Sequence, residues 1–159
     1  MFRVGTGFDL HRLEDGGPLI LGGVKIPFHR SLRGHSDADV LLHALMDALL
    51  GAAGLRDIGS HFPPGESRFK DISSLKLLSE VGKMIAESNY MVVNADMVII
   101  AEAPFLSPFI ETMKENIAST LLLPGSTLSV KATTTEGVGP CGRGEAIASQ
   151  AVVLLRVCS

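Results

Sequence analysis

The stretch ADVLLHALMDALLGAA, residues 38–53, decides the fold because it is the clearest helix in the chain and is apolar on nearly every side. Its polar side chains Asp39, His43 and Asp47 are spaced i, i+4 and i+8, so they form a single stripe along the helix. A helix that is otherwise buried keeps polar side chains only where they have partners. The pattern therefore predicts a polar site against a buried helix.

A second pair of polar side chains lies in FRVGTGFDLH, residues 2–11, which alternates like a strand. Alternation places Asp9 and His11 on the same face of that strand. We expect the neighbouring Gly5 and Gly7 to leave room there for a ligand.

Asp9, His11 and His43 together form a candidate metal site. One carboxylate and two imidazoles suit Zn²⁺ or Mn²⁺, and three protein ligands leave a position open for a substrate oxygen. The alternative is that His43 is a core histidine bonded to Asp39 or Asp47. The two interpretations combine if one of these aspartates accepts a hydrogen bond from a metal-bound imidazole.

The other segments alternate between strand and helix patterns, which predicts an α/β or α+β layer in one domain, residues 1–159, with helices on one face of the sheet. We expect Ser107-Pro108 to open the third helix, and Ser73 or Ser74 to cap the second. The expected elements are a hairpin at 19–26, polar loops at 29–37 and 60–72, helices at 74–88 and 107–122, and strands at 91–100, 127–134 and 146–157.

Composition narrows the function classes. The net charge is −3 and no basic field is evident, which argues against a nucleic-acid binder. Two cysteines suit a reducing compartment, and neither a signal peptide nor a membrane span is recognisable, so a cytoplasmic location is expected. Hydrophobic residues make up 46% of the chain, a share high enough to suggest additional burial in subunit contacts.

Three further groups are candidates for functional chemistry. His35, Ser36 and Asp37 precede the buried helix and either bind a phosphate or simply cap the helix. The run 133–136, Thr-Thr-Thr-Glu, ends a strand ahead of two glycines and suits phosphate or Mg²⁺ binding. Arg143 either binds an anion or pairs with Glu145 at a subunit contact.

These motifs occur in the order and spacing of one family, and the chain resembles the 2-C-methyl-D-erythritol 2,4-cyclodiphosphate synthases from residue 3 to about residue 155. The segments that carry the resemblance are RVGTGFDLH, LILGGVKIP, HSDADVLLHALMDALLGAAGLRDIG, AEAP, VKATTTE and GRGEAIA.

The resemblance implies a mixed sheet covered by helices on one face, with ferredoxin-like βαβ units, in a homotrimer whose active sites lie at subunit interfaces. It implies a lyase of non-mevalonate isoprenoid biosynthesis, which cyclises 4-diphosphocytidyl-2-C-methyl-D-erythritol 2-phosphate and releases CMP. Neither nucleic acid nor membrane is an implied partner.

The resemblance also assigns roles by position. Asp9, His11 and His43 match ligands of Zn²⁺ (or Mn²⁺), and Glu136 matches the ligand of a second ion, Mg²⁺ or Mn²⁺, that bridges the substrate diphosphate. His35 and Thr134 match residues that stabilise the transition state. The substrate-binding positions are Asp9, His11, His35, Ser36, Asp57, Ile58, Gly59, Phe62, Ala101, Pro104, Leu106, Thr133, Thr134, Thr135, Glu136 and Arg143.

Four positions depart from the pattern of many members. Pro64 stands in place of an aspartate, Phe105 in place of a lysine, Pro140 in place of an aromatic residue and Gln150 in place of a glutamate. The metal ligands match. Two other hypotheses are a metal-dependent phosphohydrolase and a non-catalytic trimeric module in which the metal serves structure only.

Overall fold

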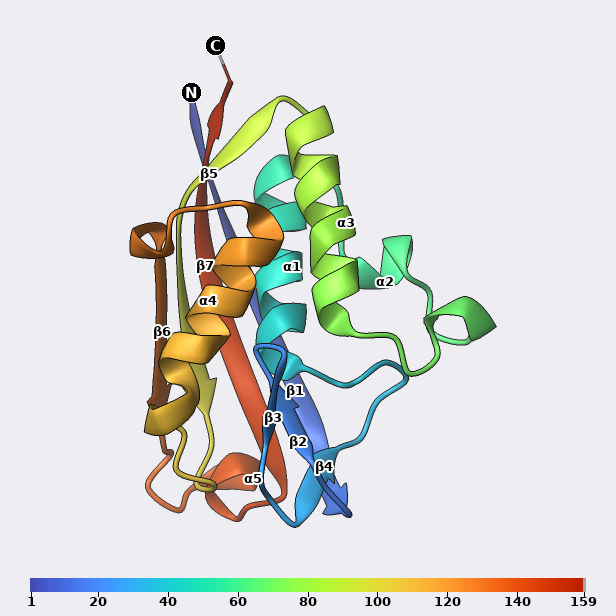
Figure 1. The fold of residues 1–159 in the computed structure, drawn as a ribbon, viewed down its shortest axis with the longest axis vertical. Coiled ribbons are helices and arrows are strands. Elements are labelled where there is room, and N and C mark those ends of the chain that lie inside the picture. Colours follow the sequence, from blue (N-terminus) through green and yellow to red (C-terminus); the bar gives the residue numbers. More distant parts are fainter. Residues whose placement is uncertain (159) are drawn as a thin grey trace.

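Two long antiparallel strands, β1 (Phe2–Asp15) and β7 (Ala146–Val157), run side by side through the middle of a mixed sheet (Figure 1). The computed structural model describes residues 1–158. The strand order of the five-stranded sheet is β4-β1-β7-β5-β6. The remaining strands are β2 (Leu19–Leu21), β3 (Val24–Ile26), β4 (Arg30–Leu32), β5 (Tyr90–Ile100) and β6 (Leu128–Thr133).

The connections confirm the predicted layered α+β class. β5 and β6 are parallel neighbours joined by α4 (Ile110–Leu121), which is one βαβ unit. β1 and β5 both run antiparallel to β7, which lies between them, and this is the split βαβ arrangement of ferredoxin-like folds.

The helices α1 (Val40–Ala53), α3 (Ser74–Glu87) and α4 cover one face of the sheet (Figure 1). α1 packs directly on β1 and β7 and contacts α3 on its other side. Eleven of its fourteen residues are therefore buried, as the apolar pattern predicted. No helix among residues 1–158 is long and apolar enough to cross a membrane.

Glycines on β1 let α1 approach the sheet closely. A Cβ added to Gly5 would lie 2.6 Å from the backbone nitrogen of Ala52, and one added to Gly7 would lie 2.8 Å from that of Ala48. Carbon and nitrogen atoms do not approach so closely without displacing the backbone. The expectation that these glycines make room for a ligand is therefore wrong, because the helix occupies that space.

The opposite face of the sheet is not covered by any helix of the described chain (Figure 1). Alternation turns the even-numbered residues of β1 toward it, and Val4 and Phe8 are 69% and 60% exposed. Val152 of β7 pairs with Thr6 and joins them on the same face. Exposed apolar side chains gathered on one sheet face are typical of a surface that a partner covers.

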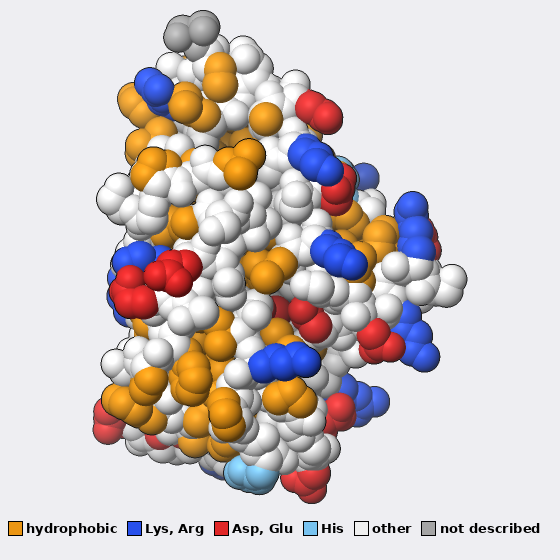
Figure 2. All heavy atoms as spheres, in the orientation of Figure 1, with side chains coloured by type: hydrophobic (Ala, Val, Ile, Leu, Met, Phe, Trp, Pro, Cys, Tyr) orange, Lys and Arg blue, Asp and Glu red, His pale blue; other side chains and the backbone are white. Residues whose placement is uncertain are grey.

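The helical face carries charges of both signs scattered among apolar patches, and no continuous basic field crosses it (Figure 2). This distribution agrees with the net charge of −3 and gives no support for nucleic-acid binding on that face.

Several elements differ from the expected ones in local detail. The predicted loop at 29–37 contains β4, and the predicted loop at 60–72 overlaps α2 (Ile58–His61) and contains a 3₁₀ turn, η1 (Ser67–Phe69). The predicted helix at 107–122 does begin at Ser107-Pro108, but its first turn is the 3₁₀ turn η2 (Ser107–Phe109) ahead of α4. The unpredicted pieces are α5 (Gly139–Gly142) and η3 (Gly125–Thr127). These pieces are three or four residues long, too short for any periodicity to reveal them.

We expect Gly7→Ala to lower the free energy of unfolding by about 2–3 kcal/mol, because the new methyl group must push α1 away from β1. In thermal unfolding the melting temperature should fall by roughly 5–10 °C. Gly125→Ala is the matched control, because no atom lies within 4 Å of its added Cβ. Equal melting temperatures for the two variants would show that the close packing of α1 on β1 does not determine the stability of the fold.

Candidate metal centre and two clefts

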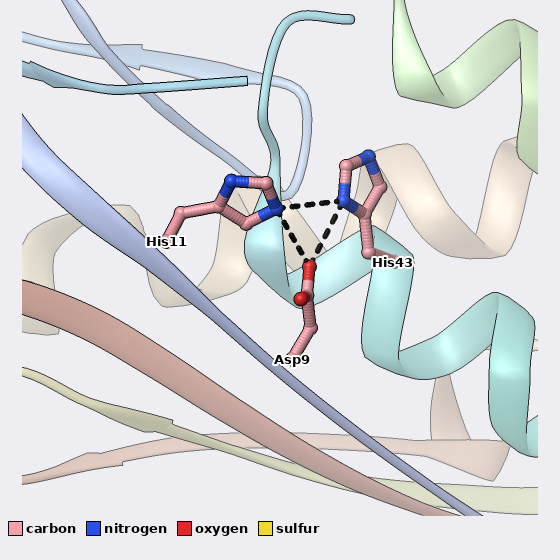
Figure 3. A group of neighbouring side chains, drawn as sticks. All are labelled: Asp9, His11 and His43. Carbon is pink, nitrogen blue, oxygen red and sulfur yellow. Dashed lines mark hydrogen bonds and ion pairs between the residues drawn. The ribbon is translucent and has the colours of Figure 1, made fainter. Parts of the chain in front are cut away.

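Asp9, His11 and His43 turn their side chains toward one point between β1 and α1 (Figure 3). The Asp9 Oδ2 atom lies 2.9 Å from His11 Nε2 and 3.0 Å from His43 Nδ1, and these two nitrogens are 3.3 Å apart. Strand alternation places the first two ligands, and the close approach of α1 brings in the third. The sequence-predicted triad is therefore assembled by the fold.

The outer atoms of Asp9 and His11 each have a partner of their own. Asp9 Oδ1 accepts a hydrogen bond from the Leu10 N–H at 2.9 Å. His11 Nδ1 lies 2.6 Å from the Arg33 carbonyl oxygen, an acceptor, so this nitrogen carries the proton and Nε2 presents its lone pair. These partners fix the ring orientation and tautomer that a metal ligand needs.

Charge interactions within the triad favour an ionised Asp9 and a protonated His11, so a cation that binds there displaces a proton from His11. Burial raises the pKa of the Asp9 carboxyl, but the neighbouring His11 and His43 rings outweigh it and hold the pKa well below its usual range. The Asp9 carboxylate, in turn, raises the pKa of His11 above its ordinary value, and burial opposes this. Asp9 is thus an anion at every physiological pH.

The triad fits a divalent ion. Metal–ligand bonds of about 2.0–2.1 Å in tetrahedral geometry place the donor atoms about 3.3 Å apart. The observed separations of 2.9, 3.0 and 3.3 Å need to open by only a few tenths of an ångström. One carboxylate and two imidazoles are donors that Zn²⁺ and Mn²⁺ accept, and the three leave a fourth position open.

The other two members of the polar stripe serve the fold. Asp39 is the N-cap of α1 and accepts hydrogen bonds from the N–H groups of Leu42, Gly22 and Gly23. Burial raises its pKa to about 6, and the backbone donors oppose this. Asp47 accepts the N–H of Ile58 at 2.8 Å. Neither aspartate bonds the His43 ring, so the expected pairing is wrong, as is the expected cap at Ser36 or Asp37.

The triad opens into a cleft of about 280 Å³, here called the metal cleft. His35 and Ser36 lie in its wall beside the metal ligands, as the sequence predicted. Three lining residues have no predicted substrate-binding role: Pro64, Phe69 and Leu77. Phe69 and Leu77 are apolar side chains that no motif marks, and Pro64 is the position where many family members have an aspartate. The metal cleft is lined by Asp9, His11, His35, Ser36, His43, Ile58, Gly59, Phe62, Pro64, Phe69 and Leu77.

A second cleft of about 630 Å³, here called the edge cleft, lies where β6 borders α4. Of the predicted substrate residues it contains Ala101, Pro104, Leu106, Thr133 and Thr134. Phe105 is part of the wall and is 80% exposed.

The two clefts are separated within the chain. Asp9 pairs with Ser149, Ser149 with Ile99 and Ile99 with Ala132, so one transverse row of the sheet joins the metal ligand to the edge cleft. Three strand spacings make this row roughly 14 Å long. Ser149 and Ile99 are fully buried under the helices, so packed core fills the interval.

The loop after β6 is held by a residue that the sequence did not single out. A carboxylate oxygen of Glu102 accepts the N–H of Thr135 at 3.0 Å and that of Gly137 at 3.3 Å. Thr134 Oγ1 lies 3.1 Å from a carboxylate oxygen of Glu136. Glu102 follows β5, the parallel neighbour of β6, and that placement is the one indication the sequence offered.

The two remaining predicted residues have local partners. The Arg143 guanidinium pairs with Glu145 at 2.7 Å, which is the pairing alternative within one chain. This ion pair raises the pKa of Arg143 and lowers that of Glu145. Asp57 is the N-cap of α2 and accepts the Ser60 N–H at 2.8 Å. Neither Asp57 nor Arg143 lines either cleft.

Fold and site together define an α+β enzyme class whose members hold a divalent ion with one carboxylate and two imidazoles beside a substrate cleft. The chain belongs to the YgbB family, whose sequence model matches residues 2–156.

Curated relatives agree over nearly the whole length. The chain is 58% identical over 153 residues to the 2-C-methyl-D-erythritol 2,4-cyclodiphosphate synthase of Pelotomaculum thermopropionicum, covering 96% of this chain and 94% of that one. It is 56% identical over 156 residues to the synthase of Geobacillus kaustophilus, covering 98% and 99%. The predicted family and enzyme class are confirmed.

Solved structures share the fold. The bifunctional IspDF of Campylobacter jejuni matches with a TM-score of 0.95 at 41% identity, and the match covers 99% of this chain and 42% of that longer one. The IspF of Plasmodium falciparum, solved as a CDP complex, matches with a TM-score of 0.87 at 34% identity over 99% and 97%. The relatives do not support the phosphohydrolase alternative, and its histidine–aspartate type, which has an all-helical frame, does not fit the five-stranded sheet.

Crystals grown with Zn²⁺ should show one anomalous-scattering peak per chain among Asp9, His11 and His43, about 2.0–2.2 Å from each donor atom. The same map from an Asp9→Ala crystal is the control and should lose the peak. A peak elsewhere with the triad empty would contradict the assignment.

Proposed function

We propose that this chain converts 4-diphosphocytidyl-2-C-methyl-D-erythritol 2-phosphate to 2-C-methyl-D-erythritol 2,4-cyclodiphosphate and CMP. The observation that carries the proposal is the Asp9–His11–His43 centre at the wall of a cleft that also holds His35 and Ser36. The names of relatives at 56–58% identity supply the substrate.

The bond changes balance without water or an oxidant. An oxygen of the 2-phosphate forms a bond to the β-phosphorus of the diphosphate. The bond from that phosphorus to the bridging oxygen breaks, and CMP departs with that oxygen. Nucleophile and electrophile are both anions, so the protein must screen charge and align the groups, and it scarcely needs a general base.

The residues of the metal cleft are suited to that task. A divalent ion bound by the triad would neutralise phosphate charge and orient the β-phosphate. The His35 imidazole and the Ser36 hydroxyl lie in the same wall and can donate hydrogen bonds to phosphoryl or polyol oxygens. The apolar Ile58 and Phe62 limit the water that reaches the reacting phosphorus.

The edge cleft is assigned to the nucleotide. Its wall combines apolar side chains with Thr133 and Thr134 hydroxyls, a mixture suited to a pyrimidine and a phosphate. Glu136, beside Thr134, would hold the second ion, Mg²⁺ or Mn²⁺, at the diphosphate. A related enzyme solved as a CDP complex supports this use of the fold.

A homotrimer with active sites at subunit interfaces reconciles the two clefts. His35 and Thr134 are both assigned to the transition state, yet they line different clefts separated by packed core. One phosphoryl group can contact both residues only if they come from two copies of the chain. The exposed apolar sheet face around Val4 and Phe8 supplies a surface for that assembly.

The proposal includes the remaining expectations. Residues 1–159 act as one catalytic domain in the cytoplasm, where the free Cys141 and Cys158 suit a reducing environment. Zn²⁺ or Mn²⁺ occupies the triad. Asp57, which directly precedes Ile58 and Gly59 of the metal cleft, and Arg143 complete the proposed substrate contacts.

Incubation with the cytidyl substrate and Mg²⁺ should yield CMP and the cyclic diphosphate in equal amounts. Both products are measured by ³¹P NMR and chromatography. EDTA should abolish both products, and added Zn²⁺ or Mn²⁺ should restore them. CMP accompanied only by a linear product would overturn the proposal.

Subunit mixing tests the shared site. His43→Ala and Glu136→Ala should each remain trimeric by light scattering and lose nearly all turnover. Refolded as an equal mixture, they should regain about a quarter of wild-type activity. This follows because three quarters of randomly assembled trimers are mixed, and each mixed trimer has one intact site of three.

The mixing experiment also separates a structural metal from a catalytic one. Activity that stays at the level of the single variants would place each site within one chain. Dissociation of the His43→Ala trimer would instead show that the metal serves assembly.

A further inference from the structure

The outer nitrogen of His43 has two possible hydroxyl partners. Its Nδ1 faces Asp9 and the metal position, so its Nε2 carries the proton. Ser36 Oγ lies 3.2 Å and Ser74 Oγ 3.1 Å from that nitrogen. Distance alone does not choose between them.

The surroundings of the two hydroxyls distinguish them. Ser74 is fully buried, and its hydroxyl donates to Asp37 Oδ1 at 2.5 Å, which leaves a lone pair free to accept from His43. Ser36 lines the metal cleft, and its Oγ already lies 3.3 Å from the Ala38 N–H. Ser74 Oγ therefore accepts the hydrogen bond from the His43 Nε2–H group, and the Ser36 hydroxyl remains available to substrate.

Asp37 is held rigidly between the beginnings of two helices. Its Oδ2 accepts the Ser74 N–H at 2.8 Å, at the first residue of α3, and its Oδ1 lies 3.3 Å from the N–H of Asp39, the N-cap of α1. The backbone N–H of Asp37 also bonds the Ile72 carbonyl at 3.1 Å. A carboxylate with this many contacts has little freedom to move.

We propose that Ser74 and Asp37 are positioning residues for the metal centre. They form a chain of hydrogen bonds from Asp37 to Ser74 to the His43 Nε2–H, which locks the imidazole with Nδ1 toward the ion and increases its basicity. The inference rests on the proposed metal site but not on the identity of the substrate. Neither residue contacts substrate.

The hydrogen bonds from Asp37 through Ser74 to His43 also connect the metal position to the wall of the metal cleft. Ser74 begins α3 directly after the segment that supplies Pro64 and Phe69, and Asp71 N–H bonds the His35 carbonyl at 3.0 Å. The serine that orients His43 therefore also fixes the end of this wall.

The test measures Zn²⁺ affinity of the full-length protein, by competition with a chromophoric chelator and without substrate. Ser74→Ala should bind Zn²⁺ about 10–100-fold more weakly than wild type. The backbone N–H at position 74 still donates to Asp37 in this variant, so the start of α3 is preserved. Ser73→Ala is the matched control and should leave affinity unchanged, because Ser73 makes no side-chain capping bond.

Two more variants make the outcome decisive. Ser74→Cys nearly keeps the size of the side chain but accepts hydrogen bonds weakly, so it should also lose Zn²⁺ affinity. It replaces Ser74→Ala in the test if that variant is too unstable to purify. Ser36→Ala should retain Zn²⁺ affinity while raising KM for the cytidyl substrate. Thermal unfolding of each metal-free variant reports whether the fold is intact.

Wild-type Zn²⁺ affinity in folded Ser74→Ala and Ser74→Cys would overturn the inference and leave Asp37 as a helix-capping residue only. If Ser36→Ala lost Zn²⁺ affinity and Ser74→Ala did not, Ser36 and not Ser74 would be the acceptor for His43. Because no substrate is present, these results stand whether or not the protein is a cyclase.

Discussion

The contact between α1 and β1 is the constraint on which the rest of the structure depends. Ala44, Ala48 and Ala52 form a small-residue row on the helix, and Gly5 and Gly7 face it from the strand. Backbone meets backbone there, so the helix axis lies closer to the sheet than larger side chains would permit. At that separation His43 on the helix reaches the carboxylate and imidazole of β1. The metal centre thus depends on five small residues, three alanines and two glycines, that contribute nothing to its chemistry.

The buried helix α1 keeps three polar residues because each of them has a partner. Each of the three side chains forms hydrogen bonds with a different segment of the chain. Asp39 ties the β2–β3 hairpin turn to the start of α1, Asp47 holds the start of α2 and His43 joins the triad. An unpaired polar group at any of these positions would cost about 1–3 kcal/mol. The polar stripe of α1 therefore fixes the positions of the β2–β3 hairpin, the start of α2 and the metal ligand His43 relative to one another.

Periodicity predicted much of this structure, and its failures have physical causes. The strand at residues 2–11 and the helix at 38–53 were predictable because their side chains alternate or recur at 3.6 residues over long runs. Asp9, His11 and His43 followed from the same patterns. The partners of the His43 ring did not, since Ser74 lies 31 residues away in sequence and a serine at a helix start looks like an ordinary cap. Likewise, glycine on a strand signals close approach without saying whether ligand or helix approaches.

Residues that act on one phosphoryl group need not be neighbours in one chain. The sheet row from Asp9 through Ser149 and Ile99 to Ala132 is filled with packed core, and no rearrangement of side chains opens it. The motifs around residues 35 and 134 are therefore separated by the feature that makes the fold stable. In the proposed homotrimer, a second copy would bring the edge cleft to the metal cleft without disturbing either core, and it would cover apolar sheet surface. Under that proposal oligomerisation is a geometric requirement of the chemistry, and burial of the exposed sheet face would stabilise the assembly.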